Sequence, residues 1–149
     1  MQAQIQTGII NLPHPVTPPL PPLQEGKHYE LKGMIIATLK EVSSDPEMFS
    51  SFMAFIRNFH NYSLYNRILI FCQRPTATQV AGFRTWKRFG RYVKQGERGI
   101  KIFAPILRNV HIEEEPDYDT GKLKKLRGYR IVSVFDYEQT GSIDGSDIK

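Results

Sequence analysis

Apolar residues repeat at helical spacing in the first half of this chain and change to strand-like alternation after Tyr92. Before Gln73 they recur at the intervals of one helix face. From Ile100 to Ile106 they occupy alternate positions, as on one face of a strand, and Arg130 to Tyr137 predicts a further strand. The change of period predicts an α+β fold, with helices packed on a small antiparallel β-sheet.

Residues that begin and end helices divide the first half into two long elements. Leu31, Ile35, Leu39 and Val42 fall on one stripe of the first helix. Asp45-Pro46-Glu47 then offers an N-cap, a proline at the first helical position and an acid in the first turn of the second helix. The second helix has an aromatic face that we expect in the core: Phe49, Phe52, Phe55 or Ile56, and Phe59.

A third and a fourth helix follow. Ser63 can cap a helix from Leu64 to Gln73, which is apolar nearly all round and should be buried between the others. Arg74-Pro75 ends it, because the residue before a proline is disfavoured in the α region. A short helix over Arg84–Phe89 should stop at Gly90.

The strand-like segments predict a hairpin. Residues 92–94 would pair with residues 100–106 through a turn at Gln95–Gly99. Alternate side chains would face the core, namely Ile100, Ile102, Ala104 and Ile106. Lys101 and Phe103 would share the opposite face.

Three segments differ in composition. Residues 1–24 carry six of the ten prolines and predict an extended or disordered arm. Residues 25–138 form the expected domain, with an acidic loop from Glu113 to Asp119 between its last two strands. Residues 139–149 are rich in Gly, Ser and Asp and predict a polar tail or linker.

Complete sets of catalytic or metal-binding residues are missing from the sequence. The single cysteine, Cys72, excludes an intramolecular disulfide and a cysteine-pair zinc site. No His-Glu-x-x-His pair, phosphate-binding glycine loop or nucleophile elbow occurs. Acidic runs in loops are usually solvated, so Glu113–Asp119 is a weak metal candidate. We expect no enzyme, no cofactor and no metal. Without a membrane span or signal peptide, we expect no membrane partner and a cytoplasmic protein.

Cationic residues gather in one third of the chain. The window from Arg57 to Arg108 holds eleven Lys or Arg residues and one acid, Glu97, together with nine of the seventeen aromatics. Cations satisfy phosphates and aromatic faces stack on unpaired bases, so their interleaving in Phe83–Tyr92 is typical of a single-strand nucleic-acid surface. The alternative is that the aromatics are core and the cations are its solvated outer face.

Candidate contacts with nucleic acid follow from this window. A helix start beside Tyr62 offers free N–H groups for a phosphate; equally, Tyr62 could pack in the core and Asn66 could bond a loop. Trp86 would more often seal a helix than stack on a base. The full candidate set is Tyr62, Asn66, Arg67, Arg74, Arg84, Trp86, Lys87, Arg88, Arg91, Lys94 and Lys101.

A series of short motifs resembles the N-terminal domain of ArdC antirestriction proteins, which also begins some plasmid-encoded primases of the TraC type. The similarity covers residues 31–137. It is densest in Phe59-His60-Asn61-Tyr62-Ser63-Leu64-Tyr65-Asn66-Arg67, Gln73-Arg74-Pro75, Trp86-Lys87-Arg88-Phe89-Gly90-Arg91-Tyr92-Val93, Gly96-Glu97-Arg98-Gly99-Ile100 and Ala104-Pro105.

The resemblance implies a single-stranded-DNA-binding domain carried by mobile elements. In that family the domain usually precedes a zinc metallopeptidase-like domain with a His-Glu-x-x-His signature, and this chain contains no such motif. The resemblance does not say which residues touch DNA. The competing hypothesis is a protein-interaction module that engages a restriction enzyme or a partner domain. Mimicry of DNA by an acidic surface is disfavoured by a pI near 9.4.

Overall fold

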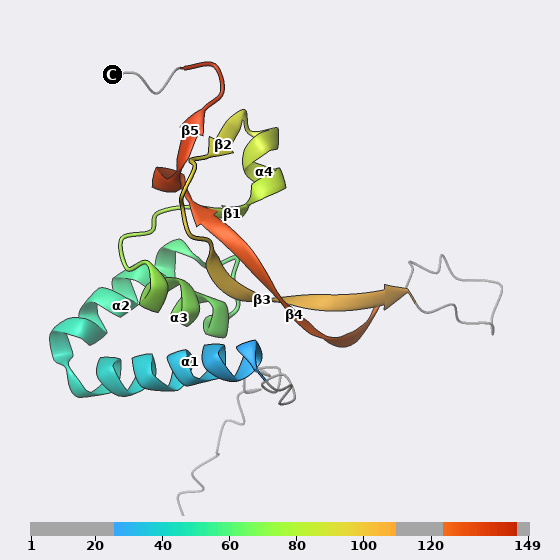
Figure 1. Cartoon of the computed structure of the whole chain (residues 1–149). Helices are drawn as coiled ribbons and strands as arrows, with labels where there is room; N and C mark the ends of the chain where they lie inside the picture. Colours follow the sequence, from blue (N-terminus) through green and yellow to red (C-terminus); the bar gives the residue numbers. More distant parts are fainter. Residues whose placement is uncertain (1–25, 110–123, 146–149) are drawn as a thin grey trace, which may run out of the picture.

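The computed structural model describes residues 26–109 and 124–145. In chain order the elements are α1 (Lys27–Ser44), α2 (Pro46–Asn58), α3 (Leu64–Gln73), β1 (Val80–Gly82), α4 (Phe83–Arg88), β2 (Arg91–Val93), β3 (Ile100–Asn109), β4 (Lys124–Asp136), the 3-10 helix η1 (Tyr137–Gln139) and β5 (Thr140–Ser142). Figure 1 shows α1, α2 and α3 at one end, α4 with β2 and β5 at the other, and the long β3–β4 pair running between and beyond them. The expected α+β class is confirmed.

Two small antiparallel sheets organise the strands. The first has the order β1-β4-β3, so β4 is central, and Val134 of β4 pairs with Gly82 on one side and Ile100 on the other. The second sheet joins β2 to β5. Because β1 pairs with the end of β4, the segment that follows α3 is held beside η1 and β5.

The predicted helix boundaries are confirmed by their caps. The Asp45 carboxylate accepts hydrogen bonds from the backbone N–H of Glu47 and Met48, and Pro46 begins α2. The Ser63 hydroxyl accepts from the N–H of Asn66 at 3.3 Å, and Arg74 is the C-cap of α3. Beyond α4, Gly90 has φ +70°, a conformation that favours glycine.

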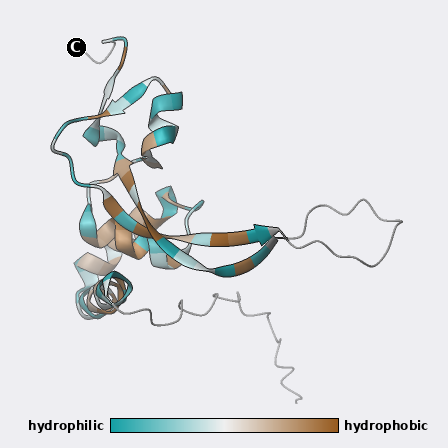
Figure 2. Ribbon diagram, turned by 45° about the vertical axis from the view of Figure 1, so that its right-hand side comes forward, coloured by the Kyte–Doolittle hydropathy of each residue, from teal (hydrophilic) through white to brown (hydrophobic). Residues whose placement is uncertain are grey.

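The core lies where α3 is covered by α1, α2 and the sheet. Ile68, Leu69 and Ile70 are at most 1% exposed, which confirms the expected burial of α3. Figure 2 shows the hydrophobic part of the ribbon gathered where the helices meet the strands. Phe52 and Phe55 meet Phe71 edge to face, with ring centroids 5.3 and 5.2 Å apart.

Two residues of the helices that we expected in the core are exposed. Leu39 is 43% exposed, and Thr38 is buried in its place, because the buried positions of α1 advance by four, three and four residues from Leu31. Phe49 is 52% exposed, whereas Phe52, Phe55 and Phe59 are buried. Phe49 lies in the first turn of α2, one turn before the positions that reach α3.

The predicted hairpin between residues 92–94 and 100–106 is also wrong. β2 pairs with β5, with Tyr92 opposite Gly141, whereas β3 pairs with β4. The pairing of β2 depends on close approach: a Cβ at Gly141 would lie 2.8 Å from Cζ of Tyr92. Both strands therefore pair with segments distant in the sequence and not with each other. For β3 the partner is β4, with which it forms ten residue pairs.

We predicted that a polar tail begins at residue 139, but the residues that follow still belong to the folded domain. Gln139 and Thr140 are 2% and 3% exposed, and β5 includes residues 140–142. The Gln139 side chain accepts from the Asp136 N–H at 2.9 Å and donates to Glu97 and to the Arg98 carbonyl. The polar composition of this segment thus serves buried hydrogen bonds. The proline-rich arm 1–24 and the acidic loop Glu113–Asp119 lie outside the described residues.

Side-chain amides from α3 satisfy the outer edge of β3. The Asn66 amide donates to the Phe103 carbonyl at 2.8 Å and accepts from the Phe103 N–H at 2.9 Å. Gln73 makes the same pair of bonds with Lys101, at 2.9 and 2.8 Å. These contacts hold α3 along β3, and they protect an edge that would otherwise leave backbone groups unpaired.

The predicted faces of β3 are therefore only partly right. Ile100 and Ile102 are buried as expected, but Phe103 is 6% exposed and not on an open face with Lys101, which is exposed. Ile106 is 42% exposed because β3 has by then passed beyond the helices. In the described part of the chain, no helix has the length and apolarity to cross a bilayer.

Candidate nucleic-acid interface

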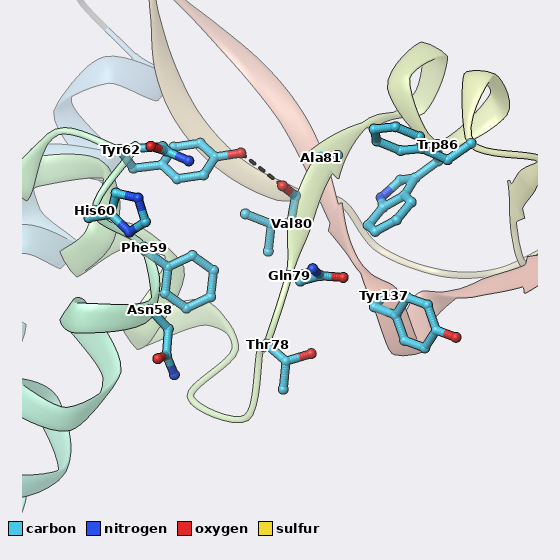
Figure 3. Close-up of a pocket in the computed structure, with 12 residues that line it drawn as sticks. Asn58, Phe59, His60, Tyr62, Thr78, Gln79, Val80, Ala81, Trp86 and Tyr137 are labelled. Carbon is cyan, nitrogen blue, oxygen red and sulfur yellow. Dashed lines mark hydrogen bonds between the residues drawn. The ribbon is translucent and has the colours of Figure 1, made fainter.

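An open cleft of about 590 Å³ separates the turn between α2 and α3 from β1, α4 and η1. Residues 58–62 form one wall, and residues 78–81 form part of the other with Trp86, Phe89 and Tyr137. Figure 3 shows these two walls facing each other, with the Tyr62 hydroxyl reaching across to the Val80 carbonyl. The cleft is thus built from three separate parts of the sequence.

Tyr62 and Arg67 shape the first wall. The Tyr62 hydroxyl donates to the Val80 carbonyl at 2.9 Å, and burial raises the pKa of this phenol. Arg67 Nε donates to the Tyr62 carbonyl at 2.7 Å, and its Nη2 donates to the His60 carbonyl at 3.3 Å. Both residues are therefore engaged in holding the α2–α3 turn in place against β1.

Aromatic rings form the second wall. Trp86 is 5% exposed, and its indole N–H donates to the Phe135 carbonyl at 2.8 Å. Phe89 and Tyr137 contact the edges of this indole, with centroids 6.3 and 6.1 Å away, yet they are 68% and 40% exposed. The buried indole therefore supports two rings that remain open to solvent.

Amide and imidazole side chains line the rest of the cleft. Asn58, His60, Asn61 and Gln79 are exposed. Among the described residues, none of these four side chains has a hydrogen-bond partner; the bonds at His60 and Gln79 involve their backbone groups. Amides and an imidazole can donate to and accept from base edges or sugar oxygens.

Helix α4, whose Trp86 lines the cleft, carries exposed cations. Arg84, Lys87 and Arg88 are exposed, and they make no ion pair with a described residue. The helix contains no acidic residue. Arg88 has one weak internal bond, to the Thr85 hydroxyl at 3.4 Å. Phe83 and Phe89 flank them and are also exposed. Open aromatic rings therefore stand at both ends of the cationic helix.

Other candidate cations have protein partners. Arg74 forms ion pairs with Asp136 and Glu138, at 3.3 and 3.5 Å. Arg91 donates to the Thr140 hydroxyl at 2.8 Å and lies 3.9 Å from the Tyr137 ring centroid.

Lys94 and Lys101 are separated by the corrected strand pairing. Lys94 donates to the Glu138 carbonyl at 3.1 Å and follows β2, whereas Lys101 donates to the Ser133 hydroxyl in the other sheet. The two lysines, which the predicted hairpin would have placed on paired strands, therefore belong to different sheets.

The structure thus divides the eleven candidates into three groups. Tyr62 and Trp86 belong to the cleft walls, and Arg67 braces the turn behind one of them. Arg84, Lys87 and Arg88 lie on α4, beside the cleft. The remaining five are Asn66, Arg74, Arg91, Lys94 and Lys101, whose polar side-chain groups bond to other parts of the protein.

Several cleft residues were not among the candidates. Asn58, His60 and Asn61 adjoin Tyr62 in the sequence, so a polar cluster in that turn was a usable signal. Phe89 lies in the basic and aromatic run already singled out. Gln79 and Tyr137 carry no local signal, because the pairing of Val80 with Asp136 brings them to the cleft.

Metal-ligating side chains do not cluster in residues 26–109 and 124–145, where no group of three His, Cys, Asp or Glu could hold an ion. The acidic run Glu113–Asp119, the weak metal candidate, lies outside these ranges.

These features define an α+β domain with an aromatic and amide-lined cleft beside a basic helix. The chain belongs to the family described as the N-terminal domain of anti-restriction factor ArdC, whose model matches residues 28–135. It is also similar to an uncharacterized protein of Bacillus anthracis, pXO2-81, with 26% identity over 131 residues. The match covers 76% of this chain but only 22% of that relative. No solved structure matches the chain.

Proposed function

We propose that this anti-restriction-type domain binds single-stranded DNA with little sequence readout, across the cleft and along α4. The observation that carries the proposal is the combination of open rings, unpartnered amides and unopposed cations around one hollow of about 590 Å³. Unpaired bases can stack on Phe89 and Tyr137, while α4 neutralises the adjoining phosphates. The family supports a role connected with nucleic acid.

Single strands fit this arrangement better than duplex does. Stacking on a protein ring requires a base whose face is free, and duplex bases are already stacked on one another. Helix α4 has only six residues, which is short for an element that reads bases in a major groove. Amides on the first wall offer hydrogen bonds that several bases can satisfy, which is consistent with weak sequence preference.

A fluorescence-anisotropy titration with single-stranded and duplex oligonucleotides of matched length tests the proposal. We expect tighter binding to the single strand and similar affinities for strands of different base composition. Equal or tighter binding to the duplex would contradict the proposal.

Phosphate contacts from α4 should appear in the salt dependence of binding. In the double variant Lys87→Ala/Arg88→Ala, the log–log slope for single-stranded DNA should become shallower by about 1.4, at about 0.7 per phosphate contact. The matched control is Lys27→Ala/Lys40→Ala, which removes two exposed cations from α1. Its slope should be unchanged. Equal changes in both variants would show that the domain senses only net charge.

Stacking on Phe89 should contribute about 1–3 kcal/mol of binding free energy. Phe89→Ala should therefore weaken single-strand binding by about fivefold to 150-fold, with no change in salt slope and little loss of stability, because the ring is 68% exposed. Phe83→Ala is the matched control on the same helix, since Phe83 is 57% exposed but does not line the cleft. Similar losses in both variants would place the stacking surface elsewhere.

The second candidate function is a protein-interaction module for a restriction enzyme or a partner domain such as the metallopeptidase-like one. Exposed apolar side chains on α1 and α2 favour it: Ile36 and Leu39 are 52% and 43% exposed, and Phe49 and Met53 are 52% and 43% exposed. Competition between an oligonucleotide and the candidate partner distinguishes the two functions. We further propose that the chain binds without catalysing a reaction and without a metal or cofactor, because the sequence holds no complete catalytic set.

A further inference from the structure

The β3–β4 ribbon projects beyond the helices, as Figures 1 and 2 show. In its outer part Ile106, Leu107 and Leu126 are 42%, 50% and 46% exposed, so both strands are uncovered there. A register shift between Ile106 and Leu107 leaves Arg127 without an opposite residue. The outer ribbon is therefore an open two-stranded arm with a bulge.

Positive charge dominates this arm. Four cationic residues are exposed, namely Arg108, Lys125, Arg127 and Arg130. Their side chains make no hydrogen bond or ion pair with described residues. The single acid in the two strands is Asp136, which is 0% exposed at the opposite end of β4. The acids Glu113–Asp119 belong to the connection between the strands and lie outside the described residues, so this charge count concerns the strands alone.

The register places three of the four cations on one side of the arm. Arg108 pairs with Lys125, and Ala104 pairs with Arg130. Paired residues share a face and faces alternate along a strand, so these cations project on one side. Ile106 and Gly128 pair between these cations on the same side. The pairs on the opposite side are Pro105 with Tyr129, Leu107 with Leu126, and Asn109 with Lys124. The cationic side thus offers phosphate contacts and no aromatic ring on which a base could stack.

The base of the arm adjoins the cleft. A second hollow of about 420 Å³ lies between the start of α3 and the ribbon, and Pro105 and Tyr129 line it. Asn61 and Tyr62 line both this hollow and the cleft. A strand that leaves the cleft past Tyr62 would therefore arrive beside the ribbon.

We propose that the β3–β4 arm binds duplex DNA next to the single strand, so that the domain recognises single-strand to double-strand junctions. This inference rests on the proposed single-strand binding in the cleft. A two-stranded ribbon has the width that a major groove admits, and its cations would neutralise the flanking phosphates. Duplex suits a cationic face without rings, because its bases need no stacking partner from the protein.

Junction binding is tested by titrating three DNAs of shared sequence: a single-stranded tail, a blunt duplex, and the duplex carrying that tail. We expect the tailed duplex to bind most tightly, and its salt slope to be steeper than that of the tail alone. In the variant Arg108→Ala/Lys125→Ala/Arg130→Ala, the slope for the tailed duplex should become shallower by about 2.7, at about 0.9 per contact with B-form DNA. The affinity of this variant for the tail alone should be unchanged.

The variant Lys87→Ala/Arg88→Ala is the matched control, because it should weaken binding of the tail and of the tailed duplex alike. Thermal unfolding of each variant should match that of the unmodified protein, since exposed cations contribute little to folding. A tailed duplex that binds no tighter than its tail would overturn the inference. The inference would also be overturned if the ribbon variant bound the tail alone as weakly as it binds the tailed duplex. The arm would then contact the single strand. Failure of the proposed cleft function would appear differently, as a tail that binds no better than the blunt duplex.

Discussion

Asp136→Ala should lower the free energy of unfolding by about 3–5 kcal/mol, because a fully buried carboxylate joins three segments of the fold. Its Oδ1 accepts from the N–H of Thr78 and Gln79 at 2.9 and 3.2 Å. Its Oδ2 accepts from Arg74 at 3.3 Å and from the Glu138 N–H at 3.4 Å. The carboxylate therefore ties the end of α3 and the entry to β1 onto the end of β4.

Two further variants separate these contributions in urea or thermal unfolding. Asp136→Asn keeps an acceptor for the two N–H groups but loses the charge opposite Arg74, so we expect a smaller loss of about 1–2 kcal/mol. Glu138→Gln alters only the 63% exposed partner of Arg74 and should change stability by less than about 0.5 kcal/mol. An Asp136→Ala protein as stable as the unmodified one would show that the segment around Thr78 and Gln79 is held by other contacts.

The same loss should be visible in DNA binding. Gln79 and Tyr137 line the cleft, and the Tyr137 N–H donates to the Gln79 carbonyl at 2.8 Å. If the carboxylate is removed, the second wall loses its anchor on α3, so folded Asp136→Ala protein should bind single-stranded DNA less tightly. The buried acid thus contributes to the proposed function without touching a ligand.

Local signals in the sequence were sufficient for the helices. Asp45 and Ser63 cap helices because their side-chain oxygens bond N–H groups two and three residues away, and such bonds depend on neighbouring residues alone. Pro46 and Pro75 act through steric restrictions on adjacent residues. The boundaries of α2 and α3 could therefore be predicted without knowledge of the tertiary structure.

Strand pairing could not be predicted in the same way. The turn at Gln95–Gly99 favours a hairpin locally, yet β2 pairs with β5 almost fifty residues later, where Gly141 accommodates the Tyr92 ring. Phe103 likewise alternates onto the expected open face, but α3 covers the edge of β3 and buries the ring. The pairing of β2 and the burial of Phe103 depend on which distant segments come into contact. The periodicity of apolar residues does not contain that information.

The candidate site was predicted in part for the same reason. The run Phe83–Tyr92 marks α4 as a basic and aromatic helix, and the structure keeps its cations exposed. The charges of Arg74 and Arg91, by contrast, are engaged by Asp136 and by Thr140 and Tyr137, which lie about fifty or more residues away. Composition counts cations, but only the fold determines which of them remain available to a phosphate.

Asn66→Ala should cost about 2–4 kcal/mol of stability, and it distinguishes a structural amide from a DNA contact. Asn66 is 8% exposed and makes both hydrogen bonds of its amide with the backbone of Phe103. Its removal leaves a buried N–H and a buried carbonyl unpaired, and each such group costs about 1–3 kcal/mol. Gln73→Ala is the matched control: it removes the equivalent pair of bonds at Lys101, where the site is more exposed, so about 1 kcal/mol should be lost.

Binding measured on folded Asn66→Ala protein completes this test. Asn66 carries no charge and lines the second hollow, not the cleft, so the affinity for single-stranded DNA and its salt slope should both be preserved once unfolded protein is excluded. A variant of unchanged stability that binds DNA several times more weakly would instead make Asn66 a direct contact, which is one of the two alternatives that the sequence left open. The helix start at Tyr62–Arg67 would then belong to the interface, and the path of the strand would run through the hollow beside Tyr129 rather than along α4.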